Sequence, residues 1–159
     1  MPQESWPDRR KRRVSHMPPP WVDDHATFFI TINCQIRGTE QLTMEATSQA
    51  VFESAEYLRV TGKWFPEIVL LMPDHLHAMA AFSWEVGSGM SAIIENWKRY
   101  LATHHGVSWQ RDFFDHRIRN EEDHSEKWAY IRENPVKAGL VDSFEEWPHV
   151  WRPEAGLGW

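Results

Sequence analysis

The chain of 159 residues is poor in cysteine, since Cys34 is the only one. One cysteine excludes an internal disulfide, which favours a reducing compartment. No apolar run approaches the roughly 18 residues that a membrane-spanning helix needs. The charged N-terminal segment leads into Pro18-Pro19-Pro20 rather than into an apolar segment, so no secretory signal peptide is expected. These absences predict a cytoplasmic protein without a membrane partner.

Positive charge is also scarce, because the net charge is −6, but the basic residues are unevenly distributed. Five basic residues and two acids give residues 1–13 a net charge of +3, so the rest of the chain carries −9. An arm of this kind fits contact with the phosphates of a nucleic acid, and it fits an ordinary solvated tail equally well. The candidate DNA-binding residues of the arm are Arg9, Arg10, Lys11, Arg12 and Arg13.

The chain divides into a basic, proline-rich arm over residues 1–26 and one domain over residues 27–159. Residues 27–36, 64–72 and 75–82 are rich in β-branched, aromatic and aliphatic side chains, which predicts three strands. Helical spacing of apolar residues predicts one helix from Thr43, as N-cap, to about Thr61, with Gly62 as its stop. It predicts a second helix over residues 91–104, before Gly106.

A short fourth strand is expected over residues 113–118, followed by a helix that Asn120 caps. That helix should end at about Glu133, because a proline at 135 disfavours helix at the residue before it. The remaining residues are expected to be irregular and packed by their aromatic side chains. The resulting order, β-α-β-β-α-β plus one helix, predicts an α+β, ferredoxin-like fold: an antiparallel sheet with two helices on one face and an added C-terminal helix.

In the second helix, Lys98 and Arg99 are expected off the apolar stripe formed by Ile94, Trp97 and Leu101. Charged residues in this position usually belong to a solvated face. They are also candidates for contact with DNA phosphates, so both interpretations are kept.

Two histidines follow the turn signal Pro73-Asp74, at the start of the third predicted strand. Because side chains alternate along a strand, His75 and His77 point to the same face. Two adjacent imidazoles form part of a metal site, although two histidines near a turn are common without a metal.

The last predicted helix carries Tyr130 and Asn134, four residues apart and therefore on one face. A tyrosine hydroxyl can act as a nucleophile that forms a covalent intermediate. An amide oxygen is a hard ligand for a divalent ion, and together with two imidazoles it leaves positions open for phosphate oxygens. Taken singly, a half-buried tyrosine and an asparagine near a helix end need no such role.

Three stretches of the sequence resemble the REP-associated tyrosine transposases, a branch of the single-tyrosine HUH transposases. They are Pro-Asp-His-Leu-His (residues 73–77), Trp-Gln-Arg-Asp-Phe-Phe-Asp-His-Arg-Ile-Arg (residues 109–119) and Tyr-Ile-Arg-Glu-Asn-Pro-Val-Lys-Ala-Gly-Leu-Val (residues 130–141). The resemblance runs from the proline-rich lead-in to Trp147-Pro148. Phe113-Phe114 stands where relatives often have tyrosines.

The resemblance implies an enzyme that cleaves and rejoins single-stranded DNA near palindromic REP-type hairpins through a 5′-phosphotyrosine. It implies Tyr130 as the nucleophile and His75, His77 and Asn134 as ligands of Mg²⁺ or Mn²⁺. It also implies a protein of the bacterial cytoplasm, associated with the nucleoid and with single-stranded or hairpin DNA, as a monomer or a homodimer. The rival hypotheses are a host-adapted protein that binds hairpins without cutting them and a metal-dependent hydrolase of a small substrate.

Overall fold

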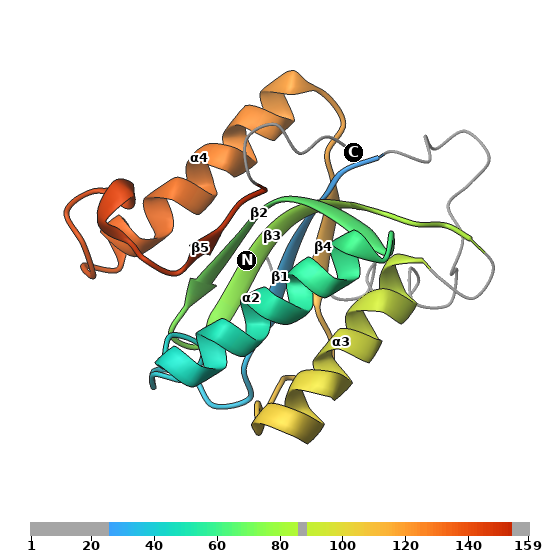
Figure 1. The fold of residues 1–159 in the computed structure, drawn as a ribbon. Helices are drawn as coiled ribbons and strands as arrows, with labels where there is room; N and C mark the ends of the chain where they lie inside the picture. Colours follow the sequence, from blue (N-terminus) through green and yellow to red (C-terminus); the bar gives the residue numbers. More distant parts are fainter. Residues whose placement is uncertain (1–25, 86–88, 154–159) are drawn as a thin grey trace.

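A five-stranded antiparallel sheet organises the chain, with the strand order β4-β1-β3-β2-β5. The computed structural model describes residues 26–85 and 89–153. Helices α2 and α3 cover one face of the sheet and α4 covers the other (Figure 1). The predicted order of elements and the ferredoxin-like fold class are confirmed.

The strands are β1 (Phe28–Asn33), β2 (Trp64–Met72), β3 (His75–Phe82), β4 (Phe114–Arg117) and β5 (Val150–Trp151). The helices are α2 (Glu45–Val60), α3 (Met90–His105) and α4 (Glu121–Lys137), with a short 3₁₀ helix η1 (Phe144–Glu146) before β5. β2 and β3 have the predicted bounds.

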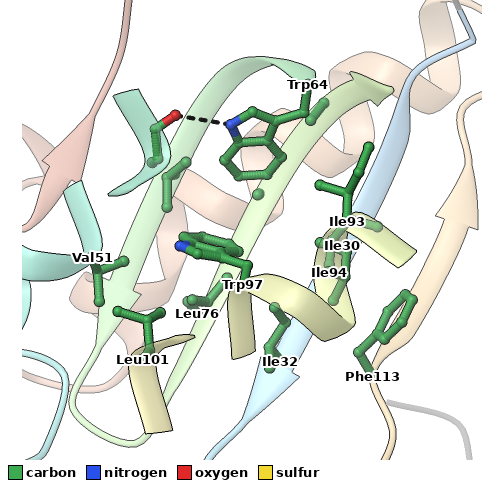
Figure 2. Packing of buried hydrophobic residues seen from close by; sticks show 14 of the residues in the cluster. Ile30, Ile32, Val51, Trp64, Leu76, Ile93, Ile94, Trp97, Leu101 and Phe113 are labelled. Carbon is green, nitrogen blue, oxygen red and sulfur yellow. Dashed lines mark hydrogen bonds between the residues drawn. The ribbon is translucent and has the colours of Figure 1, made fainter. Parts of the chain in front are cut away.

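The larger core lies between the sheet and the helices α2 and α3 (Figure 2). Trp64 of β2 is fully buried, and its indole N–H donates to the carbonyl of Ala55 at 3.0 Å. The ring of Trp97 packs against it, with ring centroids 4.9 Å apart. Burial of each large apolar side chain contributes about 1.5–3 kcal/mol relative to exposure, so this face supplies most of the fold's hydrophobic stabilisation.

A smaller core lies between the other face of the sheet and α4. Its buried members are Phe29, Ile68, Leu70, Met72, Met79 and Ile131. Alternation along β3 sends Leu76, Ala78 and Ala80 into the larger core and turns the side chains of His75, His77 and Met79 toward α4. This alternation positions the two imidazoles on the face that α4 covers.

Two predicted helix boundaries are wrong. Thr43 does not cap α2: its hydroxyl donates to Glu40 at 2.9 Å, and Met44 occupies the N-cap position. Helix α4 does not stop at Glu133 but includes Pro135 and ends at Lys137, followed by Gly139 at φ 75°. Asn120 does cap α4, since its side chain accepts from the Asp123 N–H at 2.8 Å.

The C-terminal part is more regular than the sequence predicts. β5 pairs with the edge of β2, and the indole N–H of Trp147 donates to the Leu71 carbonyl at 2.9 Å.

The first strand is shorter than expected, because beyond Asn33 only an isolated bridge between Cys34 and Trp109 continues the pairing. The predicted arm lies outside the described residues, apart from its last position, 26. Among the helices of the described part, none is long and apolar enough to cross a membrane.

Candidate active site

The tight turn at Pro73-Asp74 joins β2 to β3 and places the two histidines at the start of β3. Their rings lie with centroids 4.9 Å apart, which confirms that they share a face of the strand. β3 is a central strand, and His77 is paired with Thr31 of β1 on one side and with Leu70 of β2 on the other. Backbone pairing on both sides therefore fixes where the imidazoles stand.

His77 is 1% exposed, and its Nδ1 lies 2.8 Å from the Thr31 hydroxyl. Its Nε2 is buried and has no hydrogen-bond partner among the described residues. Burial, followed by the neighbouring His75, holds the pKa of His77 well below its usual value, while the Asn134 amide beside the ring acts in the other direction. A lowered pKa favours the neutral ring, and the tautomer with its proton on Nδ1 has a lone pair on Nε2. A buried polar atom without a partner is costly unless a ligand satisfies it.

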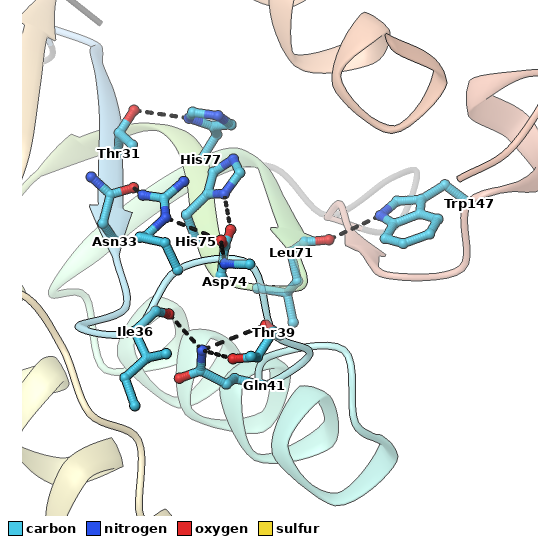
Figure 3. Close-up of polar contacts among 12 residues, drawn as sticks. Thr31, Asn33, Ile36, Thr39, Gln41, Leu71, Asp74, His75, His77 and Trp147 are labelled. Carbon is cyan, nitrogen blue, oxygen red and sulfur yellow. Dashed lines mark hydrogen bonds and ion pairs between the residues drawn. The ribbon is translucent and has the colours of Figure 1, made fainter. Parts of the chain in front are cut away.

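His75 is held by the carboxylate of Asp74, whose Oδ1 lies 2.8 Å from its Nδ1 (Figure 3). The other carboxylate oxygen accepts from the Gly38 N–H at 2.7 Å and from Arg37 Nε at 3.0 Å. Burial opposes ionisation of Asp74, but the hydrogen bonds from Gly38 and His75 and the charge of Arg37 together lower its pKa. Burial also lowers the pKa of His75. Because the clamp formed by Asp74, Arg37 and Gly38 engages Nδ1 of His75, Nε2 is the nitrogen of this ring that remains for a ligand.

Helix α4 brings the second half of the site over these imidazoles. The Tyr130 ring packs edge-on against His77 with centroids 5.4 Å apart, and against the buried ring of Phe29 at 5.8 Å. Tyr130 is 42% exposed, so solvent and a substrate can reach it. The side-chain N–H of Asn134 donates to the Tyr130 carbonyl at 2.8 Å, which fixes the amide on the helix. The structure thus brings together all four residues that the sequence singled out here.

The donor set fits a hard divalent cation with open coordination positions. The rings of His75 and His77 are adjacent, the Asn134 side chain lies beside His77, and the buried His77 Nε2 forms no hydrogen bond within the described residues. Within residues 26–85 and 89–153, no group of three or more His, Cys, Asp or Glu side chains is placed to hold a metal ion. A site here therefore depends on the neutral oxygen of Asn134.

The predicted DNA contacts on α3 separate into two cases. Lys98 is not on a solvated face: it is buried, and its ammonium donates to the carbonyls of Gln110 and Arg111, each at 3.0 Å. The prediction that Lys98 contacts DNA is therefore wrong, because its ammonium is buried and bound within the protein. Arg99 is exposed, donates to Asn96 at 2.7 Å, and lines a shallow hollow together with Arg111. The arm, Arg9 to Arg13, lies outside the described residues.

The sequence did not indicate the groups that hold the two imidazoles. Thr31 lies in an apolar strand pattern, and only its register opposite His77 gives it a role. Asp74 is predicted as a turn residue and belongs to the motif Pro-Asp-His-Leu-His, and its place directly before His75 is a usable signal for the contact. Arg37 and Gly38 come from a separate turn, and nothing local shows that they reach Asp74.

Comparison with known proteins agrees with these observations. No protein-family model matches the chain. It is 27% identical over 127 residues to a REP-associated tyrosine transposase of Escherichia coli, an alignment that covers 77% of this chain and 73% of the relative. It is 25% identical over 143 residues to a putative REP-associated tyrosine transposase of Haemophilus influenzae, covering 77% of each.

The fold also has a solved counterpart, the structure of a REP-associated tyrosine transposase bound to a REP hairpin. The TM-score is 0.70 at 23% identity, with 84% of this chain and 80% of that chain covered. This match supports the fold. Together with the two relatives, it confirms the resemblance that the three motifs indicated: the chain resembles the REP-associated tyrosine transposases in sequence and shares their fold.

Proposed function

We propose that this protein is a DNA transposase that binds hairpin DNA and cuts and rejoins an adjacent single strand through Tyr130. The observation that carries this proposal is the convergence of two distant segments on one point. His75 and His77 of β3 meet Tyr130 and Asn134 of α4 around a buried imidazole nitrogen, His77 Nε2, that forms no hydrogen bond within the part of the chain that the structure describes. The relatives' names and the hairpin in the solved counterpart support DNA as the substrate.

The nucleophile is the hydroxyl of Tyr130, a residue that is 42% exposed beside His77. Its oxygen attacks the phosphorus of a DNA phosphodiester and loses its proton to solvent, and the bond from phosphorus to the 3′ oxygen breaks. The 3′ oxygen takes up a proton and leaves as a free hydroxyl, while the 5′ phosphate stays on the tyrosine. Because one phosphodiester replaces another, the reverse attack by a 3′ hydroxyl rejoins DNA without a nucleotide cofactor.

His75, His77 and Asn134 would hold Mg²⁺ or Mn²⁺. When bound there, the ion would polarise the scissile phosphate and orient it for in-line attack. The chain prepares this arrangement in advance, because Thr31 and Asp74 fix the far nitrogens of the two rings. Phe29 stacks on His77 at 5.3 Å and keeps that ring from rotating.

In this proposal, Arg99 and the basic arm contact DNA phosphates away from the reacting bond. Such contacts supply affinity that depends on salt but not on sequence. An enzyme acting on DNA would work in the bacterial cytoplasm, close to the nucleoid.

The test is a comparison of two tyrosines on one labelled single-stranded hairpin. Tyr130→Phe removes one oxygen and keeps the ring, so the fold should survive and the hairpin should still bind. Tyr100→Phe is the matched control: it lies on α3, against the opposite face of the sheet, and is 44% exposed. On a denaturing gel, the covalent adduct should vanish in Tyr130→Phe and persist in Tyr100→Phe.

Three other results have definite meanings. Adduct that persists in Tyr130→Phe and vanishes in Tyr100→Phe refutes the assignment of the nucleophile. Hairpin binding by the unmutated protein without any adduct favours the rival, a protein that binds hairpins without cutting them. Hydrolysis of a small phosphodiester without hairpin binding favours the second rival.

A further inference from the structure

Four side chains form a line along α4: Lys127, Tyr130, Asn134 and Lys137. Their spacings of three, four and three residues place them on one helical face. Tyr130 and Asn134 at the centre of this line face the imidazoles of β3. The two lysines therefore flank the candidate active site, one on each side along the helix.

Lys127 and Tyr130 both contact the ring of Phe29. The Lys127 ammonium sits over the ring of Phe29, 5.4 Å from the centroid, and the same ring contacts Tyr130 at 5.8 Å. Asp123 lies one helical turn before Lys127. Its carboxylate is hydrogen-bonded to His116 at 2.9 Å and to the backbone N–H of Arg119. Cation–π contact with a buried ring holds the positive charge beside the site.

Lys137 lies on the other side of Asn134 and is strongly exposed. Its ammonium pairs with Glu133 at 2.9 Å, and the side chain of Lys137 is 74% accessible. The hydrogen bond that Lys137 donates to Glu133 is the largest cause of its raised pKa, and Tyr130 contributes in the same direction. Exposed ion pairs of this kind are weak, so a phosphate can replace Glu133 as the partner.

The separation of the two lysines suits a nucleic-acid strand. At about 1.5 Å of rise per residue, Lys127 lies about 4.5 Å before Tyr130 along the helix axis and Lys137 about 10.5 Å after it. The total of about 15 Å corresponds to a few nucleotides at about 3.4 Å per stacked nucleotide. One strand can therefore contact both lysines while one of its phosphates lies at Tyr130.

We propose that Lys127 and Lys137 bind backbone phosphates on either side of the bond that Tyr130 attacks, so that single-stranded DNA lies along α4. The inference rests on the proposed function, because it takes Tyr130 as the reacting group. It adds a binding surface made from the helix itself, separate from the arm and from Arg99. Phosphate contacts carry no sequence information, so this surface positions the strand and does not select it.

The experiment measures how salt weakens binding of a fluorescent oligothymidine of about 20 nucleotides. The variants are Lys127→Gln, Lys137→Gln and the double substitution, each in the Tyr130→Phe protein so that no adduct forms. Glutamine keeps helix propensity close to that of lysine, so α4 should remain intact. Lys63→Gln is the matched control, because Lys63 is an exposed lysine in the turn before β2, at the end of that strand away from His75.

The slope of log affinity against log salt should become shallower by about 0.7 for each lysine lost, and by about twice that in the double variant. Lys63→Gln should leave the slope unchanged, and Lys127→Arg should restore it. An unchanged slope in the double variant, or an equal change in Lys63→Gln, overturns the inference. A failure of the proposed function would be seen in a different experiment: the protein with both lysines intact would form no covalent adduct with hairpin DNA.

Discussion

Replacing Asp74 with asparagine tests whether the clamp on His75 sets metal affinity. One carboxylate oxygen meets His75 Nδ1 at 2.8 Å, and the other accepts from Gly38 N–H at 2.7 Å and Arg37 Nε at 3.0 Å. Asparagine has only one oxygen. When His75 binds a metal through Nε2, its proton is on Nδ1. The amide NH₂ must then face either this N–H or the donors of Gly38 and Arg37, so that a donor meets a donor.

The size of the effect follows from these contacts. Loss of the partner that orients a metal-binding histidine typically costs about 10–100-fold in metal affinity. That range corresponds to about 1.4–2.7 kcal/mol of binding free energy. An unsatisfied donor costs about 1–3 kcal/mol when buried. Since the clamp is only partly buried, we expect Asp74→Asn to lower the unfolding free energy by about 1 kcal/mol, near the lower end of that range.

The measurement is a titration with Mn²⁺, followed by the paramagnetic resonance signal of the free ion. Urea unfolding of the same samples separates loss of metal affinity from loss of fold. Asp142→Asn is the control, since Asp142 is an exposed acid before η1 with the same change of charge. It should leave both quantities unchanged.

Wild-type affinity for Mn²⁺ in a folded Asp74→Asn variant would refute the reasoning. If that variant does not fold, Arg37→Gln decides the question. It leaves the carboxylate in place and removes one of its holders, so a smaller fall in affinity is expected. No fall in a folded Arg37→Gln protein would mean that the clamp has no part in metal binding.

Three further predictions concern activity, the arm and acid stability. His75→Ala should abolish strand cleavage while the urea transition stays cooperative, and full cleavage by this variant, or in the presence of EDTA, would contradict a metal site. Deleting residues 1–13 should weaken DNA binding and flatten its salt dependence, whereas an unchanged salt slope would assign the arm no contact with DNA. Although burial acts against it, the hydrogen bond from His116 lowers the pKa of Asp123, so its stabilisation is present at neutral pH and is lost as pH falls through the folded pKa. Asp123→Asn should therefore be less stable at pH 7 and lose less stability on acidification below about pH 4, as urea unfolding at several pH values would show.

Helices and strands whose bounds follow from the local sequence were predicted well. β2 and β3 have the expected bounds, because a long apolar run is interrupted only at Pro73-Asp74. The convergence of His75 and His77 with Tyr130 was inferred from a family resemblance, and the geometry agrees with it. The roles of these residues stay predictions.

The elements that depend on distant contacts were missed. β5 has only two residues, and its pairing with β2 is accompanied by hydrogen bonds from Trp147 to the Leu71 carbonyl and from the Leu71 N–H to the His149 carbonyl. Lys98 pairs locally with Glu95 at 3.3 Å, but its burial depends on two carbonyls of a loop that follows α3, which local pattern does not show. Pro135 was expected to end α4, but the helix continues through it to Lys137 although proline donates no N–H to the preceding turn, and its side chain is buried.

The buried position of Cys34 makes the chain's single thiol a reporter of local opening. Cys34 is fully buried and directly follows Asn33, the last residue of β1, which pairs with His75 of β3. Burial first, and the nearby carboxylate of Asp74 second, raise its pKa to about 11. Near neutral pH almost no thiolate is present, and the folded protein shields the sulfur from reagents. The rate at which a thiol reagent labels the protein therefore measures how often this end of the sheet opens, without any added probe.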